Sequence, residues 1–319
     1  MKMSLSVFLQ LKGNVFLYKR LNRFLCYHFI LFLGKIYYMI NRSEKNLIIE
    51  SIEYAFMGRK SRAEIKVITK NVFRGILAHY YEKVHNAYEN INELDAFFQK
   101  YIEAPGLNKL DDALKKGKGV MLVTAHYGAV EYIPIFLALN GYPVSVVVKF
   151  KTTQLEAASK EQVKGFGMNI INAANAQSIT THIMRELRKN RVVFMECDEI
   201  DEWRPSKTNK IWFVNKLIGV DRTLDILQRR TGAEVVFAIV HRFDMLKYKF
   251  ILENCQDMLK RFGSSFSSIG AVVLKSFEEY IYSSPEGWYQ WKNFAKLERS
   301  DIYKEVYKRK SGFPSLQPT

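Results

Sequence analysis

His126 and Glu131 are the pair of residues in this sequence best suited to acid–base chemistry. A neutral imidazole can take a proton from a hydroxyl near pH 7, and a carboxylate on its second nitrogen would fix the tautomer and stabilise the imidazolium. Residues five apart do not share one face of a continuous helix. The two side chains can therefore meet only if His126 lies in a turn and Glu131 on the helix that follows. The alternative is a capping histidine beside a solvated glutamate.

The residues around this pair predict such a turn. An apolar run over 120–125 is typical of a buried strand in a mainly parallel sheet. Gly128 loosens the backbone, and apolar residues recur at helical spacing over 130–139. Ligands of open α/β sheets bind where strands end and helices begin. The context therefore favours a functional role for His126 and Glu131.

Alternating strand and helix patterns surround this stretch and predict the fold. Strands are expected at 144–148, 169–172, 191–197 and 233–240, and helices at 155–166, 179–188, 223–230 and 269–282. Residues 248–252 are expected to pair antiparallel to their neighbour. The alternation predicts right-handed βαβ units, and so an α/β fold with a mainly parallel central sheet flanked by helices.

Charged residues follow the predicted strands. Lys149 and Lys151 come directly after strand 144–148, and an acidic group that begins at Asp198 follows strand 191–197 at the sheet edge that carries His126. Residues 201–222 are expected to be irregular; Arg204, the lysines and the tryptophans would form a binding loop for an anionic, partly apolar ligand, or else a solvated loop. The six histidines and three cysteines show no metal-ligand spacing, so no metal is expected.

The net charge of +16 indicates an anionic partner: nucleic acid, an anionic membrane or an acidic protein. The basic residues are spread over both ends of the chain and the 201–222 segment. A nucleic-acid binder would gather them on one groove-entering element, so nucleic acid is not expected as a partner. The three cysteines form no disulfide framework, which suits a reducing compartment.

The N-terminal segment 1–42 combines basic and aromatic residues with an apolar run, and residues 1–40 hold no acidic residue. This predicts an interfacial or re-entrant membrane anchor on anionic lipid; a single span and a buried amphipathic helix are the alternatives. The predicted division of the chain is an anchor at 1–42, a helical region at 43–105, an α/β core at 106–298 and a basic tail at 299–319.

Several of these residues together resemble the bacterial lipid A biosynthesis (lauroyl/myristoyl) acyltransferase family, a branch of the lysophospholipid-acyltransferase-like H-x4-D/E superfamily. The resemblance covers roughly residues 20–296. It is carried by Asn46-Leu47, Phe56, Thr124 to Glu131, Lys149, Asp198, Arg230 to Ala233 and Pro285 to Trp291.

This resemblance implies transfer of a fatty acyl chain from acyl carrier protein, or acyl-CoA, to a lipid or glycolipid hydroxyl, as in the late acylation of lipid A. His126 would be the general base and Glu131 its orienting partner. Backbone N–H groups near Tyr127 and Gly128 would stabilise the oxyanion. Lys149, Lys151, Asp198 and Arg204 would contact the substrates. The reaction would need no cofactor and no acyl-enzyme, and would take place at the cytoplasmic face of the bacterial inner membrane.

Three departures from the family pattern bear on the acceptor. Lys149 stands where family members carry arginine, Asp198-Glu199 where they carry Asp-Gln, and residues 292–296 where they carry a His-Arg-Arg-type run. Arginine binds phosphate in a bidentate manner that lysine cannot reproduce. A lysophospholipid, another glycolipid or an aminolipid is therefore the alternative to a bisphosphorylated lipid A precursor. A non-catalytic lipid- or nucleic-acid-binding protein is the remote alternative, and the sequence carries no signal for an oligomeric state.

Overall fold

The computed structural model describes residues 3–149, 156–157, 160–161, 163–164, 167–173, 179–199, 204–262, 266 and 268–296. Lys151, Trp203, part of the predicted helix 155–166 and the predicted tail 299–319 lie outside these residues.

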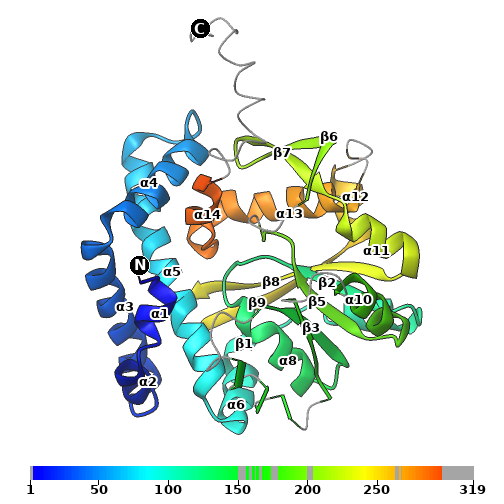
Figure 1. Ribbon diagram of the computed structural model, residues 1–319, viewed down its shortest axis with the longest axis horizontal. Coiled ribbons are helices and arrows are strands. Elements are labelled where there is room, and N and C mark those ends of the chain that lie inside the picture. Colours follow the sequence, from blue (N-terminus) through cyan, green and yellow to red (C-terminus); the bar gives the residue numbers. More distant parts are fainter. Residues whose placement is uncertain are drawn as a thin grey trace, which may run out of the picture.

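A central sheet runs through the molecule, with helices on both of its faces (Figure 1). In the described part of the chain it has seven strands in the order β1-β9-β8-β2-β5-β3-β4. Their bounds are β1 Ile102–Glu103, β2 Val120–Thr124, β3 Val144–Val148, β4 Asn169–Asn172, β5 Val192–Glu196, β8 Glu234–Asp244 and β9 Lys247–Asn254. The run from β8 to β4 is parallel, whereas β9 is antiparallel to β8. The predicted α/β fold is confirmed.

The apolar sequence of β2 explains its central place. All five of its residues are buried, because helices cover both faces of the sheet. Val120 and Leu122 pack into one hydrophobic cluster, and Met121 and Val123 pack into the cluster on the opposite face. A continuous apolar run, without polar alternation, is what such a doubly covered strand requires.

The helices of the described chain precede, follow and connect these strands. Their bounds are α1 Leu5–Leu9, α2 Lys12–Tyr18, α3 Arg23–Ile40, α4 Arg42–Phe56, α5 Arg62–Tyr88, α6 Ile91–Tyr101, α7 Asn108–Lys115, η1 Val130–Tyr132, α8 Ile133–Leu139, α10 Ile179–Arg188, α11 Thr223–Thr231, α12 Cys255–Phe262, α13 Ile269–Ser283, η3 Pro285–Gly287 and α14 Trp291–Lys296. The longest, α5, begins at a capping box in which Ser61 and Glu64 satisfy each other's backbone N–H groups.

The prediction of an irregular loop over 201–222 is wrong for the residues described there. Pro205–Phe213 (β6) and Lys216–Asp221 (β7) form an antiparallel ribbon. Its inward side chains alternate with outward ones, and Val214 and Asn215 join the strands with positive φ angles of 48° and 64°, as a tight hairpin turn requires. Lys207 and Lys210 are outward members of the ribbon, whereas Lys216 is buried.

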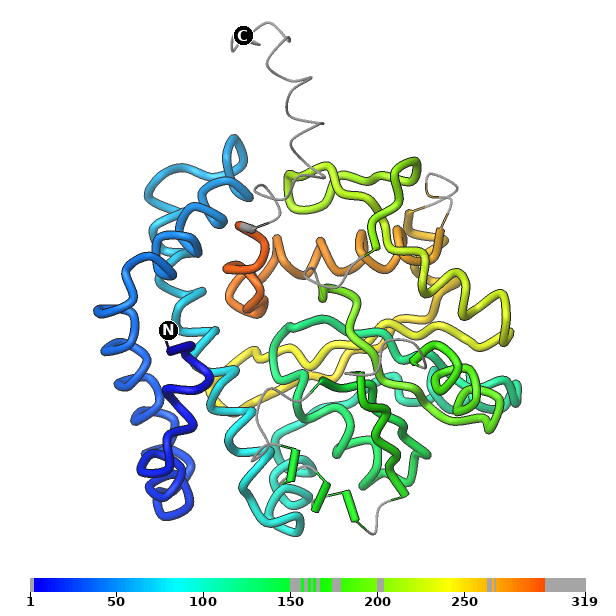
Figure 2. Tube along the Cα trace, in the orientation of Figure 1, coloured from blue at the N-terminus to red at the C-terminus, as the bar shows by residue number. Residues whose placement is uncertain are grey.

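The N-terminal segment forms three helices, α1 to α3, which lie beside α5 (Figure 2). Gly34 allows α3 to approach closely, because a Cβ at this position would overlap the Leu77 side chain of α5. Among the described helices, α3 alone is long and apolar enough to cross a membrane, and 33% of its apolar window is buried. Its other face exposes large apolar side chains: Phe24, Leu25, Phe32, Met39 and Ile40.

Candidate active site

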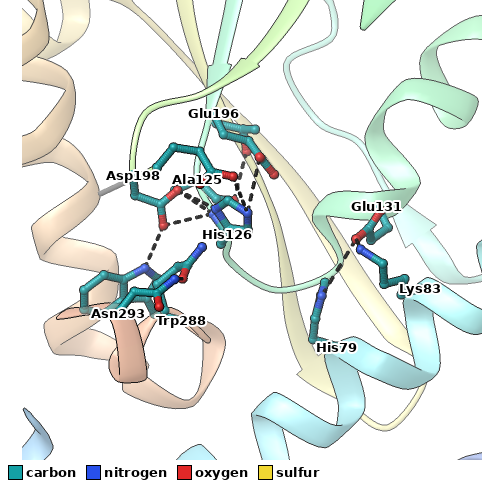
Figure 3. Close-up of polar contacts among 12 residues, drawn as sticks. His79, Lys83, Ala125, His126, Glu131, Glu196, Asp198, Trp288 and Asn293 are labelled. Carbon is teal, nitrogen blue, oxygen red and sulfur yellow. Dashed lines mark hydrogen bonds and ion pairs between the residues drawn. The ribbon is translucent and has the colours of Figure 1, made fainter. Parts of the chain in front are cut away.

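His126 lies just beyond the carboxyl end of β2, as predicted. Thr124 of β2 is the parallel register partner of Glu196 at the end of β5. Two residues beyond this pair, His126 and Asp198 lie side by side at the same edge of the sheet (Figure 3). The register of two neighbouring strands therefore positions the candidate base and its carboxylate.

Asp198 holds His126 through both its backbone and its ring. The His126 backbone N–H donates to the carboxylate at 3.0 Å, and Nδ1 lies 2.8 Å from Oδ1. Because an ionised carboxylate only accepts hydrogen bonds, Nδ1 carries the proton. Asp198 is fully buried, and its Oδ2 accepts the indole N–H of Trp288 at 2.8 Å. The histidine is thus fixed with Nε2 as its working atom.

Glu131 does not contact His126, so the predicted pairing of these residues is wrong. The Lys83 ammonium donates to Glu131 at 2.7 Å, and His79 Nε2 lies 3.8 Å from the same oxygen. In Figure 3, Glu131, Lys83 and His79 lie together on the side of His126 opposite to Asp198. Gly128 adopts a φ of +57°, and a Cβ there would overlap the Val240 carbonyl. This close contact holds the turn against β8, and η1, which follows the turn, places Glu131 beside α5.

The backbone N–H groups near Tyr127 and Gly128 do not form the predicted oxyanion hole. Gly128 N–H donates to the Gly287 carbonyl at 2.8 Å, and Tyr127 N–H donates to the Ala125 carbonyl at 2.6 Å. The Tyr127 side chain is fully buried. Both amides are satisfied by the tight turn and by the segment after α13, so neither is available to a substrate in this structure.

Two carboxylates face the Nε2 atom of His126. Glu196 Oε2 and Glu199 Oε1 each lie 3.3 Å from it. Burial opposes the charge on the ring, but Glu196, Asp198 and Glu199 raise the pKa of His126 well above its ordinary value. Burial also raises the pKa of Glu196 to about 7, against the pull of His126. The imidazole and Glu196 are therefore two neighbouring groups that can each hold a proton near neutral pH.

Sequence reasoning missed Glu196. Its signal is a single ionisable residue that closes an otherwise apolar strand. Its importance depends on β5 lying directly beside β2, which strand order alone decides.

His126, Glu196 and Glu199 offer one nitrogen and two oxygens within 4.8 Å of one another. This donor set could coordinate a divalent cation if all three groups were deprotonated. In the structure Nδ1 lies 2.8 Å from Asp198 and Nε2 lies 3.3 Å from both Glu196 and Glu199, an arrangement that suits an imidazolium whose two ring nitrogens are both donors. The residues therefore fit acid–base chemistry better than a resident metal.

A cavity of about 990 Å³ opens beside His126, a volume typical of small-molecule sites. Its polar lining includes His79, Lys83, His126, Glu131, Glu196 and Glu199. Its apolar lining includes Val146, Ile170, Ile183, Leu224 and Leu274. Of the predicted substrate contacts, Lys149 lines the cavity, and Asp198 lies buried behind His126. Arg204 is exposed at the start of the ribbon, and its backbone N–H donates to Asp221.

The cations in the described cavity wall are lysines, and two of them form ion pairs. Lys83 pairs with Glu131 at 2.7 Å, and Lys292 pairs with Glu44 at 2.6 Å. No arginine is among the described lining residues. A protein with a net charge of +16 thus encloses a cavity without the arginine forks that bind phosphate in a bidentate manner.

The chain matches a known protein family. A family model described as bacterial lipid A biosynthesis acyltransferase matches residues 11–293. No curated protein sequence matches the chain. The matched region contains the whole sheet and both His126 and Asp198.

Proposed function

The chain belongs to the bacterial lipid A biosynthesis acyltransferase family, and from this premise we propose that it moves a fatty acyl group from a thioester to a lipid hydroxyl with His126 as general base. The donor is an acyl carrier protein thioester or acyl-CoA. The observation that carries the proposal is the His126 ring, held at Nδ1 by buried Asp198 while Nε2 lies beside Glu196 and Glu199 in the wall of the cavity.

The proposed reaction is a direct acyl transfer. Nε2 takes the proton of the acceptor hydroxyl as its oxygen attacks the thioester carbonyl, and a C–O bond forms. The tetrahedral intermediate then collapses, the C–S bond breaks, and the imidazolium returns the proton to the departing sulfur. The products are an ester and a thiol. Asp198 stabilises the imidazolium between these steps, as the carboxylate of a Ser-His-Asp triad does.

The state of Cys197 supports transfer without an acyl-enzyme. This cysteine lines the same cavity. Burial, and then the charge of Asp198, raises the pKa of its thiol well above the ordinary value. Because the thiolate is the nucleophile, a thiol held protonated is a poor competitor of the lipid hydroxyl. The hydroxyl activated by His126 is therefore the proposed attacking group.

Glu196 has a role in preparing the base. His126 can accept a proton only when it is neutral, yet the surrounding carboxylates favour its charged form. Transfer of a proton from the His126 imidazolium to the Glu196 carboxylate leaves a neutral imidazole without changing the net charge of the site. Because burial raises the pKa of Glu196 to about 7, its carboxylate is a better proton acceptor near neutral pH than an ordinary glutamate. We assign Glu196 this proton-holding role.

The cavity wall favours an acceptor that brings no phosphate into the cavity. Lys83 and Lys292 are already paired with glutamates, and no arginine is among the described lining residues. A lysophospholipid, glycolipid or aminolipid hydroxyl fits this wall, with any phosphate left outside. Acylation of a bisphosphorylated lipid A precursor fits only if both phosphates remain at the rim.

We further propose that the protein works at the cytoplasmic face of the bacterial inner membrane. The exposed apolar face of α3 is accompanied by the basic residues Lys12, Lys19, Arg20 and Lys35, and residues 3–40 contain no carboxylate. This combination suits insertion into an anionic leaflet. Since the opposite face of α3 packs on α5, the helix would lie along the membrane rather than cross it.

The test is acyl transfer by the purified His126→Ala variant. Labelled acyl carrier protein thioester and acyl-CoA would each be offered with total membrane lipid, and new esters identified by mass spectrometry. Transfer should fall by about 10²- to 10⁴-fold while the circular dichroism spectrum stays unchanged. His182→Ala, on α10 outside the cavity, is the matched control. Undiminished acylation by His126→Ala would contradict the proposal.

A further inference from the structure

A second, polar hollow lies close to the active-site cavity. It has a volume of about 480 Å³ and lies between the β6–β7 ribbon, α11 and the start of α13. We call it the arginine notch, because Arg222 and Arg229 line it together with the hydroxyls of Ser206, Thr208 and Ser268. From its contacts we infer that the arginine notch binds the phosphate of the phosphopantetheine arm that carries the acyl thioester. This inference rests on the proposed function.

The two guanidinium groups are available to an anion. Arg222 and Arg229 are exposed, and neither forms an ion pair or a side-chain hydrogen bond in the described part of the chain. The one carboxylate in the notch, Asp225, is directed elsewhere, because it accepts the backbone N–H groups of Ile269 and Gly270 at 2.8 and 3.5 Å. Arginine forks match phosphate oxygens in a bidentate manner.

The hydroxyls of the notch are set up to donate. Ser206 Oγ accepts the backbone N–H groups of Thr208 and Asn209, at 3.3 and 2.9 Å. Ser268 Oγ accepts the Asn209 side-chain amide at 2.9 Å and the Ala271 backbone N–H at 3.3 Å. A hydroxyl whose two lone pairs are occupied has only its own hydrogen left to offer. Ser268 therefore acts as a donor toward an anion in the notch, whereas the Ser206 hydroxyl also lies 3.4 Å from Thr208 Oγ1.

The start of α13 adds a third favourable contribution. Ser268 is the N-cap of this 15-residue helix, and it lines the notch. The amino end of a helix carries a partial positive charge that stabilises phosphate groups. The first three backbone N–H groups of α13 are already bound by Asp225 and by Ser268 Oγ, so a phosphate in the notch would be held chiefly by the two guanidinium groups and a serine hydroxyl.

The arginine notch and the active-site cavity share a wall. Asp221, Thr223 and Leu224 line the cavity, whereas the intervening and following residues, Arg222 and Asp225, line the notch. The same alternation occurs at α13, where Gly270 lines the cavity and Ser268 the notch. An arm anchored by its phosphate in the notch can therefore enter the cavity over residues 221–224 and present its thioester to His126.

The position of the notch favours the donor over the acceptor as the source of the phosphate. The cavity lining reaches from Ser4 and Glu44, in the N-terminal helical region, to Thr223 at α11. Figure 1 shows α11 and the β6–β7 ribbon on the opposite side of the molecule from α1 to α3. A lipid acceptor would enter from the apolar α1–α3 side. The water-soluble donor would then enter from the notch side.

The experiment measures the binding of 4′-phosphopantetheine and of pantetheine by isothermal titration calorimetry. The protein carries His126→Ala, so that no chemistry is needed for the measurement. We expect phosphopantetheine to bind at least about tenfold more tightly than pantetheine. Adding Arg222→Gln and Arg229→Gln should abolish this preference, whereas Arg230→Gln, an exposed arginine of the same helix outside the notch, should retain it. Equal binding of the two probes, or an unchanged preference in the double variant, would overturn the inference.

Kinetics with His126 intact separate the possible sources of the phosphate. The double variant should raise the KM for acyl-CoA and for the acyl carrier protein thioester, with kcat and the KM of the acceptor lipid retained. A raised KM for the acceptor alone would show that the notch serves a lipid phosphate, and the inference would be wrong. If phosphopantetheine binds as expected but no acyl transfer occurs in the intact protein, the proposed function fails and the binding site stands.

Discussion

Asp198 binds His126 at two points, through the backbone N–H at 3.0 Å and through ring Nδ1 at 2.8 Å. The two contacts fix both the place of the residue and the rotation of its ring. Trp288 supports the same carboxylate from behind, with its indole N–H at 2.8 Å. His126, the candidate base, is therefore positioned by residues that are distant in sequence, whereas the nearby Glu131 pairs with Lys83.

Exchange of Asp198 and of Glu131 should have different effects. Asp198→Asn removes the acceptor at Nδ1 and favours the wrong tautomer, so kcat should fall by about 10⁴-fold, as in triads of this kind. Glu131→Gln weakens only the contact with Lys83 and should retain most of the activity and the pH profile of the wild type. Steady-state transfer rates of both variants are the measurement. An equal loss of activity in both variants would contradict this expectation and support the pairing of His126 with Glu131.

The pH dependence of transfer should reveal the carboxylates around His126. Since Glu196, Asp198 and Glu199 raise the pKa of His126, kcat/KM should fall as the pH drops through a value above the ordinary histidine range. Glu196→Gln removes one negative charge beside the ring, lowers the pKa of His126 and should shift this acidic limb to lower pH. The exposed Glu50→Gln variant is the control. An acidic limb that stays in place would exclude Glu196 from the proton balance.

The buried ion pair of Glu82 and Arg242 should be important for stability. The Arg242 guanidinium donates to both carboxylate oxygens of fully buried Glu82 at 2.7 Å. Arg242→Met leaves an uncompensated buried charge, so the free energy of unfolding in urea should fall by about 3–5 kcal/mol. The double variant Glu82→Leu with Arg242→Met should recover most of that loss. A single variant as stable as the wild type would contradict this expectation.

Membrane binding should depend on the outer face of α3. Replacing Phe24, Phe32 and Met39 by serine removes exposed apolar surface, and binding to vesicles that contain phosphatidylglycerol should weaken by more than about tenfold. The melting temperature should hardly change, since these side chains are outside the core. Leu259→Ser, an exposed leucine on α12, is the matched control. If the triple variant cosediments with vesicles as much as the wild type does, this face of α3 does not bind the membrane.

Local sequence patterns were sufficient to predict most strands of the central sheet and the turn that carries His126. The apolar run of β2 and the glycine that follows it specify strand and turn without reference to any other segment. The carboxyl ends of parallel strands share one edge of a sheet, so the acidic group beginning at Asp198 could be placed at the edge of His126. Its hydrogen bond to the ring could not be predicted, because the register of β2 and β5 is a non-local property.

The same limit explains the errors. The pairing of Glu82 could not be predicted either, because nothing near it in sequence indicates that Arg242, 160 residues later, will contact it inside the core. Glu131 follows a turn whose direction is set by contacts of Gly128 with β8. The β6–β7 ribbon was predicted as a loop because its polar residues were read as a run, although they alternate with buried Ile211 and Phe213.

Ser4 and Leu5 of α1 line the same cavity as His126, and α1 packs against α3. With α3 lying in the leaflet, the acceptor would slide sideways from the bilayer to the imidazole. Each methylene group brought into water costs about 0.8 kcal/mol, so lifting a long-chain lipid out of the membrane would be prohibitive. Lateral entry keeps the hydrocarbon tails covered during the whole transfer, and only the reacting hydroxyl leaves the headgroup layer.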